Sequence, residues 1–171
     1  NIPTTVTFID FGAFNGCSVL KKVYIEDIEA WNEVTFDDET ASPLYYNATL
    51  YLNNEELTNL VFPEGTTVIN SIAWRNCLTY KTVTIPSTIV AINDEAFINC
   101  SGITNVKIED ADSYTIGMEA FRNCKNITTI ELGDGLTTIG QWAFLNCSKL
   151  VSINIPTTVT FIDFGAFNGC S

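Results

Sequence analysis

The residues of this chain best suited to chemistry are six cysteines that recur at a nearly constant interval. They are Cys17, Cys77, Cys100, Cys124, Cys147 and Cys170, with one long first interval followed by four that are nearly equal. Stacked equivalent positions would lie about 4.7–4.9 Å apart with parallel Cβ directions, which fits the disulfide dihedral poorly. The chain also has no C-x₂₋₄-C pair of the kind that zinc sites use. We therefore expect a column of buried free thiols, with no metal and no cofactor.

Other catalytic chemistry has little support in the sequence. The chain contains no histidine, which excludes His-based triads, His general bases and His metal ligands. The acidic run Asp37-Asp38-Glu39 lacks the spacing and the glycine of an EF-hand calcium loop, and we interpret it as a solvated loop. We therefore expect a protein that is not an enzyme.

The cysteines belong to a repeated unit that fixes their positions. Each stands three places after the aromatic of an Ala-aromatic pair, from Ala13-Phe14 to Ala166-Phe167. The N-terminal segment 1–18, NIPTTVTFIDFGAFNGCS, returns unchanged as segment 154–171. Such self-similarity predicts a stack of repeats with one shared core and no separable domains. The repeats, which we call rungs, are 2–24, 25–61, 62–84, 85–107, 108–131 and 132–154, with 155–171 opening a seventh. Rung 25–61 is irregular and longer than the others.

Each rung has the same order of short elements. An apolar phrase L-x-x-I-x-I-P, such as residues 150–156, predicts a strand with one buried face, ended by proline. A second apolar phrase ends at a column of Gly, Asn or Asp, which predicts a tight left-handed corner. The members of that column are Asp10, Asn70, Asn93, Gly117, Gly140 and Asp163. The Gly or Asn before each cysteine predicts a second corner. Between the corners we expect about one helical or 3₁₀ turn, with the aromatic rings stacked from rung to rung.

The combined phrase L-x-x-I-x-I-P…V-x-x-I-G-x-x-A-F-x-x-C resembles the BspA-like class of leucine-rich repeats, found in bacterial and some protist surface proteins. The resemblance covers essentially the whole chain, and segments 28–31, 42–46 and 50–54 are similar to a recurrent insertion in that class. It implies an α/β solenoid, mostly β: a right-handed leucine-rich-repeat superhelix with a period of about 23, parallel strands and short helical or 3₁₀ turns. It also implies a secreted or cell-surface adhesion protein, and the class shares no catalytic residues.

Charge narrows the range of partners. The net charge is −12, from 8 basic and 20 acidic residues, which disfavours nucleic acid and anionic membranes. No apolar run approaches the 18 or so residues of a transmembrane helix, so we expect no direct membrane insertion. The remaining expectation is a protein or glycan ligand. The alternative is a structural stalk or fibre in which the unit from one end segment to the next recurs in a longer array. In that array Val19-Leu20-Lys21, or a close variant, would follow Ser171, and separate copies would self-associate end to end.

Two surfaces are candidates for binding. The first is the outer face of the strand sheet, made by Lys22, Tyr24, Asn59, Val61, Thr82, Thr84, Asn105, Lys107, Thr129, Glu131, Ser152 and Asn154. The second is the irregular rung with the sheet beside it, which together hold four of the six tyrosines.

We expect recognition to centre on Tyr24, Tyr45, Tyr46 and Tyr51, with Asp37, Asp38 and Glu39 at the rim. A hairpin over residues 50–57, turning at Asn53-Asn54, would hold Tyr51 on a rigid element. The alternative is that Trp31 and at least one tyrosine fill the core of a wider rung.

Overall fold

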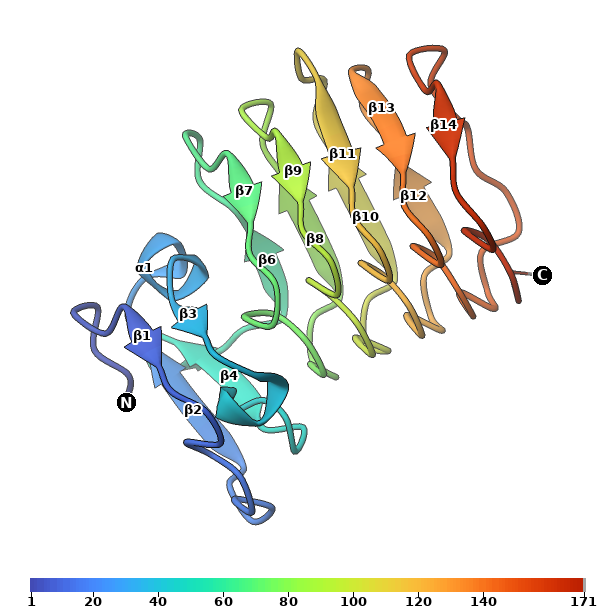
Figure 1. The fold of residues 1–171 in the computed structure, drawn as a ribbon. Coiled ribbons are helices and arrows are strands. Elements are labelled where there is room, and N and C mark those ends of the chain that lie inside the picture. The colour runs from blue at the N-terminus through green and yellow to red at the C-terminus, as the bar shows by residue number, and fades with distance from the viewer. Residues whose placement is uncertain (171) are drawn as a thin grey trace.

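The computed structural model describes residues 1–170 as a parallel β-solenoid of about seven turns with little helix (Figure 1). Each turn adds a strand to one or both of two layers that enclose the core. One layer holds β2 (Lys22–Ile25), β4 (Thr49–Leu52), β6 (Asn59–Val61), β8 (Thr82–Ile85), β10 (Asn105–Ile108) and β12 (Thr129–Glu131). The other holds β1 (Phe8–Ile9), β3 (Thr35–Phe36), β7 (Val68–Ile69), β9 (Ala91–Ile92), β11 (Tyr114–Ile116), β13 (Leu136–Ile139) and β14 (Phe161–Ile162). The remaining elements are α1 (Ile28–Asn32), the 3₁₀ turn η1 (Glu39–Ala41) and β5 (Glu55–Glu56). Within residues 1–170, no helix is both long enough and apolar enough to span a bilayer.

The irregular rung divides the stack into two blocks (Figure 1). In the C-terminal block the strands run β6-β8-β10-β12 and β7-β9-β11-β13-β14, and partners lie one regular repeat apart, as Thr82 lies opposite Asn105. In the N-terminal block β2 pairs with β4 across a longer interval, from Lys22 to Thr49. Only a short segment then separates the end of β4 from Asn59 at the start of β6. The irregular rung therefore combines one wide turn with a short connection from β4 to β6. This connection contains β5, which pairs antiparallel with β4.

One buried asparagine joins the two blocks. The side-chain Nδ2 of Asn32 donates to the carbonyl of Val68 (2.8 Å), and its Oδ1 accepts from the N–H of Asn70 (3.1 Å). These are the backbone groups that a neighbouring strand would pair on the open edge of β7. The same Oδ1 accepts from Trp74 Nε1 (2.9 Å), and Asn32 is only 3% exposed. The side-chain amide of Asn32 therefore makes the hydrogen bonds that a neighbouring strand would make with β7.

The core repeats the same contacts from rung to rung. The rings of Phe97, Phe121, Phe144 and Phe167 form a stack with centroids 5.1, 5.4 and 5.3 Å apart, which confirms the expected aromatic column. The asparagines of the second corner form a parallel chain of amides. For example, Asn99 Nδ2 donates to Asn76 Oδ1 (3.0 Å). Close stacking of identical side chains therefore fills both the apolar core and a polar corner.

The first predicted corner is misplaced by two positions. The column that ends the second apolar phrase has no positive φ. The left-handed residue stands directly before each Ala-aromatic pair: Gly12, Ile72, Glu95, Glu119, Trp142 and Gly165. A non-glycine residue in this conformation costs about 1–2 kcal/mol. Bonds to the next rung offset that cost, as where Glu95 N–H donates to the Met118 carbonyl (2.8 Å). Gly117 and Gly140 lie in the original column because a Cβ at either would lie within 2.6 Å of an atom of the previous rung.

The second corner is confirmed, with positive φ at the residue before every cysteine, from Gly16 to Gly169. Between the corners the chain makes the expected short turn. It consists of single turns closed by bonds between residues three apart, as from Ile98 N to Glu95 O (3.1 Å) and from Cys100 N to Phe97 O (3.2 Å), and the left-handed residues keep these turns from extending into a helix. Residues 151–156 carry the strand phrase but form no strand, and Val151 is 76% exposed.

Asn32→Ala tests the joint between the blocks. The substitution leaves the Val68 carbonyl, the Asn70 N–H and the Trp74 indole N–H without their partner in a buried site. We expect the free energy of unfolding to fall by about 3 kcal/mol, from the cost of unsatisfied buried groups. Urea denaturation measures it. Asn59→Ala, on the exposed face of β6, is the matched control and should cost much less. Equal losses for the two variants would contradict the role given to Asn32.

Candidate binding surface

The outer face of β2 and β4 carries two tyrosines side by side. The parallel register places Tyr24 opposite Tyr51, and alternation along the strands turns both away from the buried Val23 and Leu50. Their ring centroids are 5.1 Å apart, with the planes tilted by 36°. Lys22 Nζ lies 4.9 Å from the centre of the Tyr51 ring, in a cation–π contact. Both rings are half-buried, so they form a fixed aromatic surface with its faces partly open.

The β4–β5 hairpin frames this surface. It turns at Asn53-Asn54, with φ of 51° and 69°, as the sequence predicts, and places Glu56 opposite Tyr51. Beside the tyrosines is an open depression of about 420 Å³. Its lining residues are Asn1, Tyr24, Ile25, Glu26, Asn53 and Asn54. An aromatic surface next to amides and a carboxylate can hold a partner with both an apolar face and hydrogen-bond donors.

Tyr45 and Tyr46 form a separate pair at the corner before β4. Their ring centroids are 4.9 Å apart in an edge-to-face contact of 87°. The Tyr46 hydroxyl donates to Asn15 Oδ1 (3.3 Å) and accepts from the Gly16 N–H (3.1 Å). The Tyr45 carbonyl accepts from Asn76 Nδ2 (3.4 Å). The structure thus brings the four tyrosines together as two pairs, and the second pair connects corners of successive rungs.

The acidic run lies in the turn around η1. Asp38 is the N-cap of η1 and accepts from the N–H groups of Gly12 (3.0 Å) and Ala41 (2.9 Å). The hydrogen bond from the Thr40 hydroxyl, followed by these backbone bonds, holds the pKa of Asp38 below its ordinary value. Glu39 Oε2 pairs with the Arg75 guanidinium at 2.9 Å, and Asp37 is exposed. Two of the three acids therefore have structural partners.

Trp31 belongs to the core, at 2% exposure, and its Nε1 donates to the Ala73 carbonyl (2.9 Å). The prediction that Trp31 fills the wider rung is confirmed, whereas none of the four tyrosines is fully buried. Sequence reasoning missed Asn32 and Arg75, which join the irregular rung to its neighbours. Both are polar residues in otherwise apolar surroundings, but no local pattern identifies their partners.

The outer face of β6, β8, β10 and β12 is more polar. The twelve residues that we expected to face outward are exposed or half-exposed. Beyond the tyrosine pair they are mostly short polar side chains, with bonds such as that from Thr82 Oγ1 to Asn59 Oδ1 (2.9 Å). Aromatic surface on this layer is therefore confined to its N-terminal end.

The cysteines form the expected column, but only four of the six are buried as expected. All six are free, and Cys77, Cys100, Cys124 and Cys147 are fully buried. Each thiol from Cys100 onward donates to the carbonyl of the aromatic one rung back, as from Cys124 Sγ to Phe97 O (3.2 Å). Burial raises the pKa of Cys100 and Cys124 well above the ordinary value and that of Cys147 to about 12. Cys17 and Cys170, in the first and last rungs, are partly exposed. Among residues 1–170, no group of three or more His, Cys, Asp or Glu could hold a metal ion.

Comparison with known proteins identifies the repeat. The family model described as BspA type leucine rich repeat region matches residues 1–43 and 45–171 in six copies. A search of curated proteins gives no match.

Similar solved structures include a leucine-rich repeat protein from Eubacterium ventriosum, with 22% identity and a TM-score of 0.64 over 97% of this chain and 43% of that chain. A leucine-rich repeat protein from Bacteroides ovatus has 21% identity and a TM-score of 0.59, over 99% of this chain and 52% of that chain. A leucine-rich cell surface protein from Faecalibacterium prausnitzii has 23% identity and a TM-score of 0.53, over 96% and 55%. The chain spans about half the length of these proteins, and at such identities the likeness shows the fold.

The thiol column gives a prediction about reactivity. We expect a water-soluble thiol reagent to modify Cys17 and Cys170 in the folded protein, and the four buried cysteines only after denaturation. Burial raises the pKa values of Cys100, Cys124 and Cys147 and keeps these thiols protonated, so the modification rate at those three sites should not rise between pH 7 and pH 9. Mass spectrometry of native and denatured samples gives the modified sites. Rapid labelling of Cys100 or Cys124 in the native state would show that the column is open to solvent.

Proposed function

Because the chain belongs to the BspA-type leucine-rich repeat family, we propose that it is a non-catalytic binding module of a secreted or cell-surface protein that adheres to a protein or a glycan. The family match covers nearly the whole chain. One structural neighbour is a leucine-rich cell surface protein, which supports the proposed location.

The tyrosine pair on β2 and β4 carries this proposal. Tyr24 and Tyr51 are half-buried and held on paired strands, so they lose little conformational entropy when a partner binds. Aromatic side chains supply much of the binding energy at recognition surfaces. The proposed binding residues are therefore Tyr24 and Tyr51. Tyr45, Tyr46, Asp38 and Glu39 make the structural contacts described above and support the neighbouring corner.

The polar groups around the pair favour a partner that donates hydrogen bonds. Glu26 and Glu56 are exposed beside the two tyrosines, and Asn53 and Asn54 line the adjoining depression. Carboxylates accept from hydroxyl or ammonium groups, while the open ring faces take apolar surface. Sugar hydroxyls and basic protein surfaces both meet these requirements. A polyanion would be repelled by the net charge of −12.

A structural stalk is the second candidate, and one observation favours it. The outer face of the C-terminal block consists mainly of short polar side chains on strands of constant register. A uniform polar surface of this kind suits a spacer, and the identical end segments suit a tandem array. The two roles are compatible, because the aromatic surface occupies only the N-terminal block.

Tyr24→Ala and Tyr51→Ala separate binding from stability. We expect each to weaken attachment by about 1–2 kcal/mol, roughly 5- to 30-fold in Kd, because each removes half of the aromatic surface. The melting temperature should change little, since neither ring is in the core. The binding assay uses panels of immobilised glycans and purified extracellular matrix proteins, followed by titration of the best ligand.

Tyr45→Ala is the matched control, because it removes a half-buried tyrosine from the other pair. Its affinity should equal that of the unaltered chain. Unchanged affinity in both Tyr24→Ala and Tyr51→Ala, or no ligand in either panel, would contradict the proposed binding surface. The structural stalk would then be the favoured function.

A further inference from the structure

The segment repeated at the two ends, 1–18 and 154–171, has a different neighbouring rung in each place. Each copy therefore makes a different set of backbone contacts. At the N-terminus the segment packs only against the rung that follows it. The carbonyls of Thr7 (3.0 Å) and Ile9 (3.1 Å) accept from the N–H groups of Thr35 and Asp37. The N–H of Phe14 donates to the Thr40 carbonyl (3.2 Å). The N–H groups of Gly12 and Gly16 also donate to the next rung, to the side chains of Asp38 and Tyr46.

At the C-terminus the described part of the same sequence, 154–170, packs against the rung before it. The N–H groups of Thr160 (3.0 Å) and Asp163 (2.9 Å) donate to carbonyls of β13. The carbonyls of Phe164, Ala166 and Asn168 accept from N–H groups of the preceding corner at 3.1, 2.8 and 2.8 Å.

Outside the strand ladders, the two sets of backbone groups do not overlap. In the numbering of the N-terminal copy, the C-terminal copy uses the N–H groups of positions 7 and 10 and the carbonyls of positions 11, 13 and 15. The N-terminal copy uses the carbonyls of positions 7 and 9 and the N–H groups of positions 12, 14 and 16. Each copy therefore leaves free the set that the other uses.

We propose that a second copy of this chain stacks on the first, head to tail, with residues 154–171 of one copy in register against residues 1–18 of the next. The pairing follows the rule between existing rungs, in which the Thr137 carbonyl accepts from the N–H of its equivalent, Thr160. At the joint the Thr160 carbonyl accepts from Thr7 N–H of the second copy. The Phe167 N–H likewise donates to the Ala13 carbonyl of the second copy.

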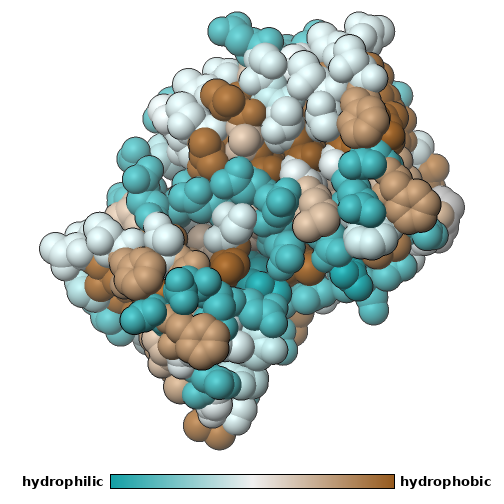
Figure 2. Space-filling view, in the orientation of Figure 1, coloured by the Kyte–Doolittle hydropathy of each residue, from teal (hydrophilic) through white to brown (hydrophobic). Residues whose placement is uncertain are grey.

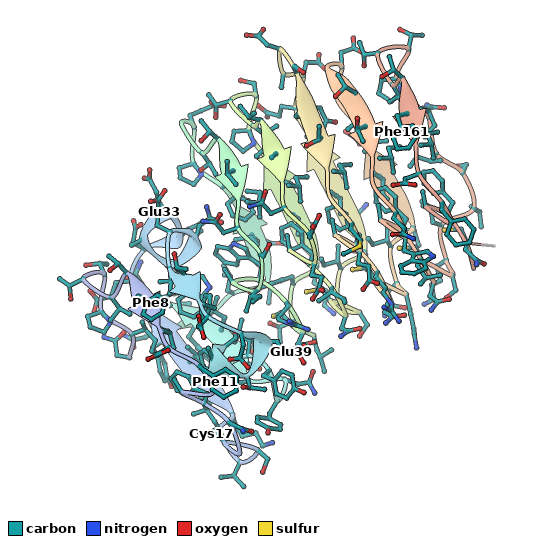
Figure 3. All side chains as sticks on the ribbon, in the orientation of Figure 1. Phe8, Phe11, Cys17, Glu33, Glu39 and Phe161 are labelled. Atoms are coloured by element: carbon teal, nitrogen blue, oxygen red, sulfur yellow. The ribbon has the colours of Figure 1, made fainter. Side chains whose placement is uncertain are left out.

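The apolar residues on the two ends match this arrangement. Phe8 and Phe11 are 53% and 72% exposed, and their equivalents Phe161 and Phe164 are 53% and 69% exposed. Figure 2 shows apolar side chains over β1 and over the β13–β14 end, and Figure 3 labels Phe8, Phe11 and Phe161 there. Ile162 is 47% exposed, whereas its N-terminal equivalent, Ile9, is covered by the next rung and only 8% exposed. Stacking would bury Ile162 in the same way.

The proposed contact pairs the C-terminal face of one copy with the N-terminal face of the next. Because these two faces differ, the assembly does not close on itself or stop at two copies. It also brings Asp163 of one copy next to Asp10 of the other, at a column where the regular rungs carry Asn or Gly. Salt screens this repulsion. Association should therefore strengthen as ionic strength rises, which distinguishes this joint from one held by opposite charges.

Two variants that each remove one face provide the test. Thr7→Pro removes an N–H that has no backbone partner within residues 1–170 and is needed only at the joint. Ile162→Glu places a carboxylate where the single chain leaves it half in water but the joint would bury it. Thr7→Ala and Val90→Glu are the controls, the latter at a position 56% exposed in the middle of the stack.

Sedimentation velocity over a range of concentrations gives the outcome. The unaltered chain and both controls should form a concentration-dependent series of oligomers, and each face variant alone should associate at least tenfold more weakly. An equimolar mixture of Thr7→Pro and Ile162→Glu should form a one-to-one dimer and nothing larger, because only one intact pair of faces remains. That dimer also shows that both variants are folded. A monomeric unaltered chain at high micromolar concentration, unaffected variants, or a mixture that stays monomeric would overturn the proposal. None of these outcomes depends on the tyrosine surface.

Discussion

The hydrogen-bond ladder between successive rungs is the constraint on which the rest of the molecule depends. It fixes the spacing at that of neighbouring β-strands, so every side chain lies about 4.8 Å from its equivalents. Only side chains that can stack on themselves suit such columns. Phenylalanines stack with rings 5.1–5.4 Å apart, and asparagines chain their amides at 2.8–3.0 Å. The cysteines fit for the same reason, because a small thiol can donate to the carbonyl of the previous rung and leave no buried polar group unpaired.

The irregular rung breaks this lattice at a cost that particular polar residues offset. A strand edge left open in the interior would leave backbone groups unpaired, so the amide of Asn32 takes the place of a strand beside β7. Arg75, with a side chain only 5% exposed, pairs with Glu39 across the same junction and with Glu95 beyond it. The break ends one sheet and starts another. The tyrosine pair thereby comes to lie on a short three-stranded sheet at one end of the molecule, apart from the polar face of the regular rungs.

Identical segments at the two ends give the solenoid an unusual relation to its own edges. Open edges of sheets are aggregation hazards that proteins usually block with charge, proline or a covering element. Here each open edge has the sequence that, at the other end, is already paired within the stack. In the proposed head-to-tail stack, each of these edges would pair with its equivalent segment in the next copy.

The sequence by itself determined the features that repeat. The period, the inward alternation of strands such as Thr82–Ile85, the thiol column, the corner before each cysteine and the turn at Asn53-Asn54 all follow from local residue preferences applied at a fixed interval. Tertiary structure decided what depends on contacts between rungs. Glu95 and Trp142 adopt a left-handed backbone because bonds to the next rung support it, although neither residue type favours it alone. Asn32 pairs backbone groups beside β7 in place of a strand, and the four tyrosines form two pairs, because the wide turn puts Tyr24 and Tyr51 on neighbouring strands and Tyr45 and Tyr46 at the corner before β4. Periodicity gives the position of a residue within a rung, but where the period fails only the three-dimensional path shows which residues meet.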